Sequence, residues 1–122
     1  MIIHGREIGL RLTLGAALEI AKLTPHGSID EIGEVLGAGS FAEQLDLIMR
    51  FVEAMSNGYE AARAFEEPGY AKRPLTYEEL QTLDMSELIA LQHAAFAAFS
   101  QDTKTEVEVE ESKKEEAPPR SA

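Results

Sequence analysis

The sequence contains no cysteine and no tryptophan, and it is poor in positive charge. Without cysteine the chain has no disulfide, no thiolate metal site and no cysteine nucleophile. Its 11 basic residues stand against 22 acidic ones, giving a formal net charge of −11. Proteins that bind duplex DNA gain affinity by neutralising phosphates with Lys and Arg, so nucleic acid is not expected as a partner. For the same reason, an anionic membrane surface is not expected either.

Long apolar runs are also absent. No run approaches the roughly 20 residues that a membrane-spanning helix needs, and the N-terminal residues lack the apolar core of a signal peptide. We therefore expect a soluble protein of the cytoplasm. Apolar residues still make up 44 % of the chain, enough for one modest core.

The composition changes abruptly at Gln101–Asp102. Residues 1–101 carry 15 acidic and 7 basic side chains and are rich in apolar residues at helical spacing. Residues 102–122 carry 7 acidic and 4 basic side chains and have no apolar stripe. Such a segment cannot bury enough apolar surface to offset the entropy of ordering. The sequence predicts one helical domain over residues 1–101 and a disordered, acidic tail over residues 102–122.

The first residues predict a short β-hairpin that lies on the helices. Ile2-Ile3 and the alternating Ile8, Leu10 and Leu12 are typical of strands, and residues 4–7 supply the turn. An isolated hairpin is marginally stable, so packing on the helical body is needed.

Several helix starts are marked by capping residues. In a capping box the side chain of a Ser or Thr binds a free amide of the first turn, and a Glu three residues later binds the amide of the cap. Thr13 is expected to cap a first helix that Thr24-Pro25 ends. Four boxes or their acidic equivalents are predicted, at Ser28–Glu31, Ser40–Glu43, Thr76–Glu79 and Asp84–Glu87.

The third helix has the clearest apolar periodicity. Its seam follows heptad spacing and consists of Phe41, Leu45, Ile48, Val52, Met55, Tyr59 and Ala62. Such a seam is more typical of an intramolecular core than of a dimer, and self-association is left open. Gly58 is the weak point, where we expect the helix to bend or break. The last helix is expected from Ser86 to about Gln101. The predicted fold class is mainly α, with a short N-terminal β-hairpin and a disordered acidic C-terminal tail.

No residue pattern indicates catalysis or a bound cofactor. His4, His26 and His93 lack the spacing that would bring two onto one helix face, and no serine lies in a nucleophile elbow. We expect no enzyme activity, no metal site and no cofactor.

Four stretches of the sequence carry a family likeness: the opening run over residues 3–16, Leu23-Thr-Pro followed by Ile29-Asp-Glu-Ile, the stretch from Met55 to Glu60 and the helix start over residues 75–80. In these stretches the chain resembles the tail assembly chaperones of long-tailed, non-contractile bacteriophages. The charged end rich in Lys and Glu is similar as well. The likeness covers most of residues 1–101 in layout.

The resemblance implies a function in tail assembly. Members of the family coat the long, helical tape-measure protein and keep it soluble until tail-tube subunits polymerise around it. A longer form, made by a ribosomal frameshift, recruits the tail-tube protein, and this chain looks like the shorter product. A chaperone of this kind would act in the host cytoplasm and be absent from the mature virion.

Two hypotheses assign residues to this function. The first places client-binding surface on the last helix, at Leu88, Leu91, Phe96 and Phe99. It predicts that replacing both phenylalanines by serine abolishes client binding and leaves the fold intact. The second takes Lys113-Lys114, whose codons are rich in adenine, as the position of the frameshift.

Other functions are also open from the sequence. A small acidic regulatory protein that binds and inhibits another protein is the main alternative, because acidic helical inhibitors can mimic nucleic acid. A helix-turn-helix protein is disfavoured because Glu31, Glu34, Glu43 and Asp46 would face phosphates.

Overall fold

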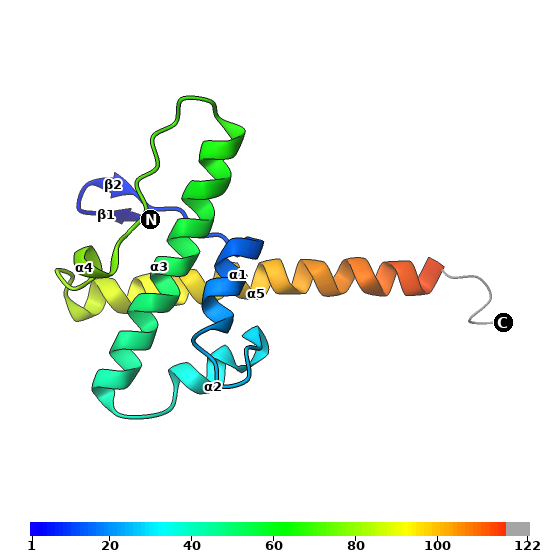
Figure 1. Ribbon diagram of the computed structural model, residues 1–122, viewed down its shortest axis with the longest axis horizontal. Helices are drawn as coiled ribbons and strands as arrows, with labels where there is room; N and C mark the ends of the chain where they lie inside the picture. The colour runs from blue at the N-terminus through cyan, green and yellow to red at the C-terminus, as the bar shows by residue number, and fades with distance from the viewer. Residues whose placement is uncertain (117–122) are drawn as a thin grey trace.

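The computed structural model describes the backbone of residues 1–116 and the side chains of residues 1–101, and it is mainly helical (Figure 1). An antiparallel hairpin opens the chain and pairs Ile2 with Glu7 and Ile3 with Arg6. The predicted fold class is confirmed for the helical body and the N-terminal hairpin. The elements are β1 (Ile2–Ile3), β2 (Arg6–Glu7), α1 (Leu14–Ala21), the 3₁₀ helix η1 (Ile29–Glu31), α2 (Ile32–Leu36), α3 (Phe41–Glu66), α4 (Tyr77–Leu80) and α5 (Met85–Glu116).

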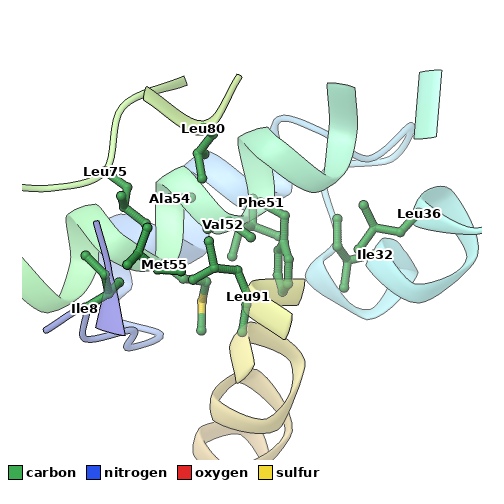
Figure 2. Close-up of a cluster of buried hydrophobic side chains, with 13 residues drawn as sticks. Ile8, Ile32, Leu36, Phe51, Val52, Ala54, Met55, Leu75, Leu80 and Leu91 are labelled. Atoms are coloured by element: carbon green, nitrogen blue, oxygen red, sulfur yellow. The ribbon is translucent and has the colours of Figure 1, made fainter. Parts of the chain in front are cut away.

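Helix α3 runs through the middle of the body, and the other elements pack around it. In Figure 1, α1 and α2 lie to one side of α3, the hairpin and α4 lie to the other, and α5 crosses it. The core centres on Phe51, Val52 and Met55, none of which has any exposed surface. Figure 2 shows these side chains among core residues from several elements: Ile8, Ile32, Leu36, Leu75, Leu80 and Leu91.

The heptad seam of α3 therefore has two kinds of position. Val52 and Met55 at its centre are buried, which confirms the expectation of an intramolecular core there. Phe41 at its start is 67 % exposed, because α3 begins beyond the elements that cover its middle. The seam is an apolar core at its centre and open at its N-terminal end.

The helix does not break at Gly58. Helix α3 is continuous from Phe41 to Glu66, and Gly58 is buried where the chain entering α1 passes over it. The backbone N–H of Arg11 donates to the carbonyl of Met55 at 3.0 Å. A Cβ atom at Gly58 would lie 2.4 Å from the carbonyl oxygen of Arg11 and 2.8 Å from Oγ1 of Thr13. Gly58 thus allows the segment before α1 to approach α3 closely, and the predicted break is wrong.

Most of the predicted caps are present. The Thr13 hydroxyl accepts from the amide of Ala16 at 3.2 Å, and Thr76 accepts from the amide of Glu79 at 3.1 Å. Two reciprocal boxes are complete, at Ser40–Glu43 and Asp84–Glu87. At Thr76 the box is only half formed, because the Glu79 carboxylate binds Arg6.

The predicted box at Ser28–Glu31 is wrong. Ser28 makes no side-chain cap, and residues 29–31 form a 3₁₀ turn. Instead, the Glu31 carboxylate accepts a hydrogen bond from the backbone N–H of His26 at 3.3 Å, and its other oxygen lies 2.7 Å from Nδ1 of the His26 ring. His26, two residues before Ser28, therefore binds the Glu31 carboxylate that a capping box at Ser28 would need.

This contact couples the titration of His26 to that of Glu31. Their hydrogen bond raises the pKa of His26 and lowers the pKa of Glu31. The contribution of His26 to folding stability is therefore fully present below its unfolded-state pKa, and it is lost as the pH rises through its folded-state pKa. The contribution of Glu31 to folding stability is fully present above its unfolded-state pKa, and it is lost as the pH falls through its folded-state pKa. The pair should be strongest at mildly acidic pH, and its effect on stability should be small because His26 is exposed.

An NMR titration of the histidine ring tests this. In Glu31→Gln the pKa of His26 should fall to the ordinary value for histidine. A pKa that stays raised in this variant would show that another group holds the proton.

Helix α5 is longer than predicted. Its backbone continues past the expected end near Gln101 to Glu116. The expectation used the loss of an apolar stripe as the stop signal, but most of residues 102–116 are Lys or Glu, which have high intrinsic helix propensity. Residues 117–122 lie outside the described part of the chain, as do the side chains of residues 102–116. None of the helices in the described part combines the length and the hydrophobicity that a bilayer crossing requires.

Candidate partner-binding surfaces

The residues predicted to bind a client on α5 lie in or against the core. Leu91 has no exposed surface and Leu88 is 6 % exposed, so both pack inside the folded chain. Helix α5 packs on α3 through this face. Leu88 and Leu91 therefore do not form an exposed surface in this structure. Sequence periodicity identified the apolar face of α5 and left open whether α3 or a partner covers it.

Phe96 and Phe99 lie at the rim of the core. Both are half-buried and form a cluster of three rings with the fully buried Phe51. The ring centroids of Phe51 and Phe96 are 5.0 Å apart, and those of Phe51 and Phe99 are 5.8 Å apart. Tilted contacts of this kind stabilise aromatic pairs beyond their area burial. Both residues thus have a packing role, and a role in client binding stays a prediction.

The Lys113-Lys114 pair falls among residues whose side chains are not described. The backbone at these positions belongs to α5. Their assignment as a frameshift position concerns the gene and stays a prediction.

The most exposed large apolar side chains lie elsewhere, on α1 and at the end of α3. Phe65 is 91 % exposed, Leu14 is 82 % exposed and Leu18 is 68 % exposed. Helix α1 turns Ala16 and Ile20 to the core, which leaves Leu14 and Leu18 on its outer face. Phe65 occupies the last turn of α3, beyond the part that α1 covers.

A shallow groove runs between α1 and α3 next to these side chains. Its volume is about 220 Å³, and we call it the α1–α3 groove. Small residues make up much of its walls, and Gly15 and Glu19 on α1 directly follow Leu14 and Leu18 in sequence. On α3, Phe65 lies one helical turn beyond the lining residue Ala61. The lining residues are Thr13, Gly15, Ala16, Glu19, Ala54, Asn57, Gly58 and Ala61.

Cations near this groove are paired with acidic residues of the same chain. Arg11 lies 3.3 Å from Glu66, and Lys22 lies 3.0 Å from Glu19. Elsewhere on α3, Arg50 pairs with Asp46, and Arg63 pairs with Glu67 just after the helix. These basic side chains therefore add little net positive charge to an acidic body.

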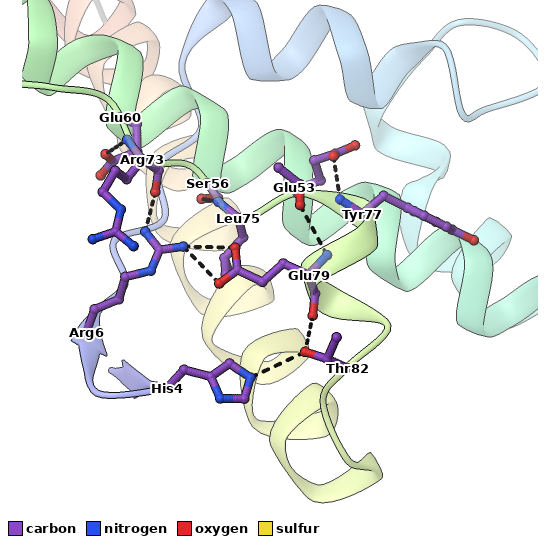
Figure 3. A network of polar contacts seen from close by, with 11 residues as sticks. His4, Arg6, Glu53, Ser56, Glu60, Arg73, Leu75, Tyr77, Glu79 and Thr82 are labelled. Carbon is purple, nitrogen blue, oxygen red and sulfur yellow. Dashed lines mark hydrogen bonds and ion pairs between the residues drawn. The ribbon is translucent and has the colours of Figure 1, made fainter.

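A polar network on the opposite side of α3 has a structural role. Three side chains of α3 accept hydrogen bonds from backbone N–H groups of residues 73–77, which end at the first residue of α4 (Figure 3). Glu53 binds the amide of Tyr77, Ser56 that of Leu75 and Glu60 that of Arg73, at 2.7, 2.8 and 2.7 Å. The donors are alternate residues of an extended chain that runs antiparallel to α3.

The three acceptors on α3 and the three donors in residues 73–77 are spaced along their backbones by similar distances. Seven residues of helix, from Glu53 to Glu60, rise about 10 Å. Four residues of extended chain, from Arg73 to Tyr77, span about 13 Å, and the long glutamate side chains bridge the difference. Arg6 closes the network from the hairpin by donating to the Arg73 carbonyl and to both carboxylate oxygens of Glu79. The sequence signal was a polar row at i, i+3 and i+7 on an otherwise buried helix, which the heptad analysis passed over.

Glu60 is a buried acidic residue that accepts two hydrogen bonds in this network. It is buried, and its Oε1 accepts both the Tyr70 hydroxyl and the Arg73 amide at 2.7 Å. Glu60→Met should lower the free energy of unfolding by about 2 kcal/mol, because the Arg73 amide loses its acceptor. Glu60→Gln keeps an oxygen at this position and should cost clearly less. Urea unfolding of both variants checks this, and equal losses would contradict the role of the Oε1 atom.

The histidines do not gather into a site. His26 pairs with Glu31, and His4 Nε2 lies 3.4 Å from the Thr82 hydroxyl. Among the side chains that the structure describes, no three His, Asp or Glu residues come together in an arrangement that could hold a metal ion.

Comparisons of this chain with protein-family models, with curated proteins and with solved structures found no match.

Proposed function

We propose that this chain is a tail assembly chaperone of a long-tailed bacteriophage, which binds the tape-measure protein and keeps it soluble during tail assembly. The resemblance over most of residues 1–101 supports the family. One structural observation supports the client-binding role. Leu14, Leu18 and Phe65 present large apolar side chains to solvent from the helices of an acidic body.

The physical demands of the function suit such a body. A long helical client exposes apolar stripes that aggregate unless another surface covers them. Many chaperone copies along one client would bind through weak, repeated contacts that gain from multivalency. The excess of acidic residues would keep the coated complexes apart through mutual repulsion. Each element of this account concerns binding and none requires a reacting group.

The proposal extends to a longer product and to location. A frameshift near Lys113-Lys114 would add a C-terminal extension that recruits the tail-tube protein. The complex would form in the host cytoplasm, and the chaperone would leave before the virion is complete. The coding DNA tests this part, because a heptameric slippery sequence should lie in the codons of residues 102–122 and a long tape-measure gene should follow.

The client-binding role is tested by co-purification. The tape-measure protein from the same gene cluster is expressed with a tagged copy of this chain, and the complex is recovered on the tag. We expect the two proteins to elute together by size exclusion, with several copies of this chain per client. Recovery of the chain alone, with an intact client left behind, would contradict the proposal.

A further inference from the structure

We propose that the α1–α3 groove, with Leu14, Leu18 and Phe65 close to it, docks one amphipathic helix whose apolar stripe is flanked by Lys or Arg. The inference deepens the proposed function and depends on it, since the docked helix would belong to the client. It places the client on α1 and the end of α3, where no partner residue was predicted from the sequence.

Exposed apolar side chains occur near this groove. The three most exposed large apolar residues in the described part of the chain are Phe65, Leu14 and Leu18. None of the three lines the α1–α3 groove itself, but Leu14 and Leu18 adjoin its lining residues Gly15 and Glu19 in sequence, and Phe65 lies one helical turn beyond its lining residue Ala61. Single exposed apolar side chains are common on protein surfaces, but several of them close to one groove are typical of an interaction site.

The shape of the groove suits a helix. Leu14 and Leu18 are one turn apart on α1, and Ala61 and Phe65 are one turn apart on α3. A helical ligand presents side chains at the same interval, at positions i and i+4. Gly15 and Ala61 leave the walls low, so that large side chains of the ligand can enter.

The net negative charge of the body favours basic residues beside the apolar stripe of the docked helix. The cations close to the groove, Arg11 and Lys22, already pair with Glu66 and Glu19. The remaining excess of acidic side chains in residues 1–101 sets the sign of the field that an approaching helix meets. Basic flanks are attracted by this field and acidic flanks are repelled. The partner is therefore a basic amphipathic helix.

Two designed peptides of 21 residues serve as probes for the full-length chain. Both have leucine at the a and d positions of three heptads, and the flanking positions carry lysine in one and glutamate in the other. We expect the lysine peptide to bind at least tenfold more tightly at low salt, measured by fluorescence anisotropy. Equal affinities, or tighter binding of the glutamate peptide, would overturn the proposed partner.

Variants locate the binding surface. The double variant Leu18→Ser and Phe65→Ser should weaken binding of the lysine peptide at least tenfold, whereas Ile89→Ser, an exposed residue of α5, should leave it unchanged. Amide shifts in NMR spectra of the unaltered chain give an independent measurement and should concentrate in residues 14–19 and 54–65. Unchanged affinity in the double variant, or shifts centred on α5, would overturn the assignment.

The test separates this inference from the proposed function. If the unaltered chain co-purifies with the tape-measure protein and the double variant does so equally well, the function stands and the groove is not the client site. If the unaltered chain fails to co-purify, the proposed function is wrong whatever the peptides show.

Discussion

Replacing Gly58 by alanine should destabilise the protein by about 1–2 kcal/mol. The new Cβ would lie 2.4 Å from the Arg11 carbonyl oxygen and 3.0 Å from Cβ of Ala16, so the backbone of the segment entering α1 would have to move. Overpacking of this kind costs about 1–3 kcal/mol and sometimes more. Alanine gains about 1 kcal/mol in intrinsic helix propensity, which offsets only part of the cost. Urea unfolding monitored by circular dichroism measures the difference.

Gly33 provides a matched control for this variant. It lies in α2, and a Cβ there would meet no other atom within 4 Å. Gly33→Ala should therefore leave stability unchanged or raise it by up to about 1 kcal/mol. Two glycine-to-alanine changes in helices are thus expected to have opposite signs. A stabilised Gly58→Ala variant would mean that α1 does not cross α3 at this point.

Replacing both Phe96 and Phe99 by serine should destabilise the fold by about 4 kcal/mol. Both rings pack on Phe51, and their loss would leave a cavity beside the largest side chain of the core. The sequence-based hypothesis predicted loss of client binding with an intact fold for this same variant. The structure leads us to expect that any loss of binding would follow from partial unfolding. Thermal unfolding should show a midpoint many degrees lower than in the unaltered chain.

The same Phe→Ser change at exposed positions serves as the control for this prediction. Phe41→Ser and Phe65→Ser remove rings that are 67 % and 91 % exposed, and each should change stability by no more than about 0.5 kcal/mol. If the double variant at Phe96 and Phe99 is as stable as these, the two rings do not belong to the core.

Features set by neighbouring residues could be predicted from the sequence. The caps at Thr13, Ser40 and Asp84 depend on residues three positions apart, and all three are present. The box at Ser28 failed because His26 lies close enough to take the Glu31 carboxylate, a competition that cap spacing does not describe. Gly58 was misjudged because its role depends on a segment more than forty residues away.

The candidate site could not be predicted for a related reason. Helix α1 carries apolar residues on most of its sides, so its sequence does not show which of them face water. The approach of α3 at Gly58 decides this by covering Ala16 and leaving Leu14 and Leu18 open. The apolar face of α5 was identified correctly, but its coverage by α3 buries Leu88 and Leu91. Periodicity identifies an apolar face, and tertiary packing determines whether that face remains available to a partner.

The soluble fraction of the tape-measure protein during co-expression tests the central claim most directly. We expect the client to be mostly insoluble when expressed alone and mostly soluble when this chain is present in excess. Glu31→Gln, which alters an exposed ion pair, should preserve this effect, since it changes no apolar surface. A client that remains insoluble with the folded chain in excess would contradict the account.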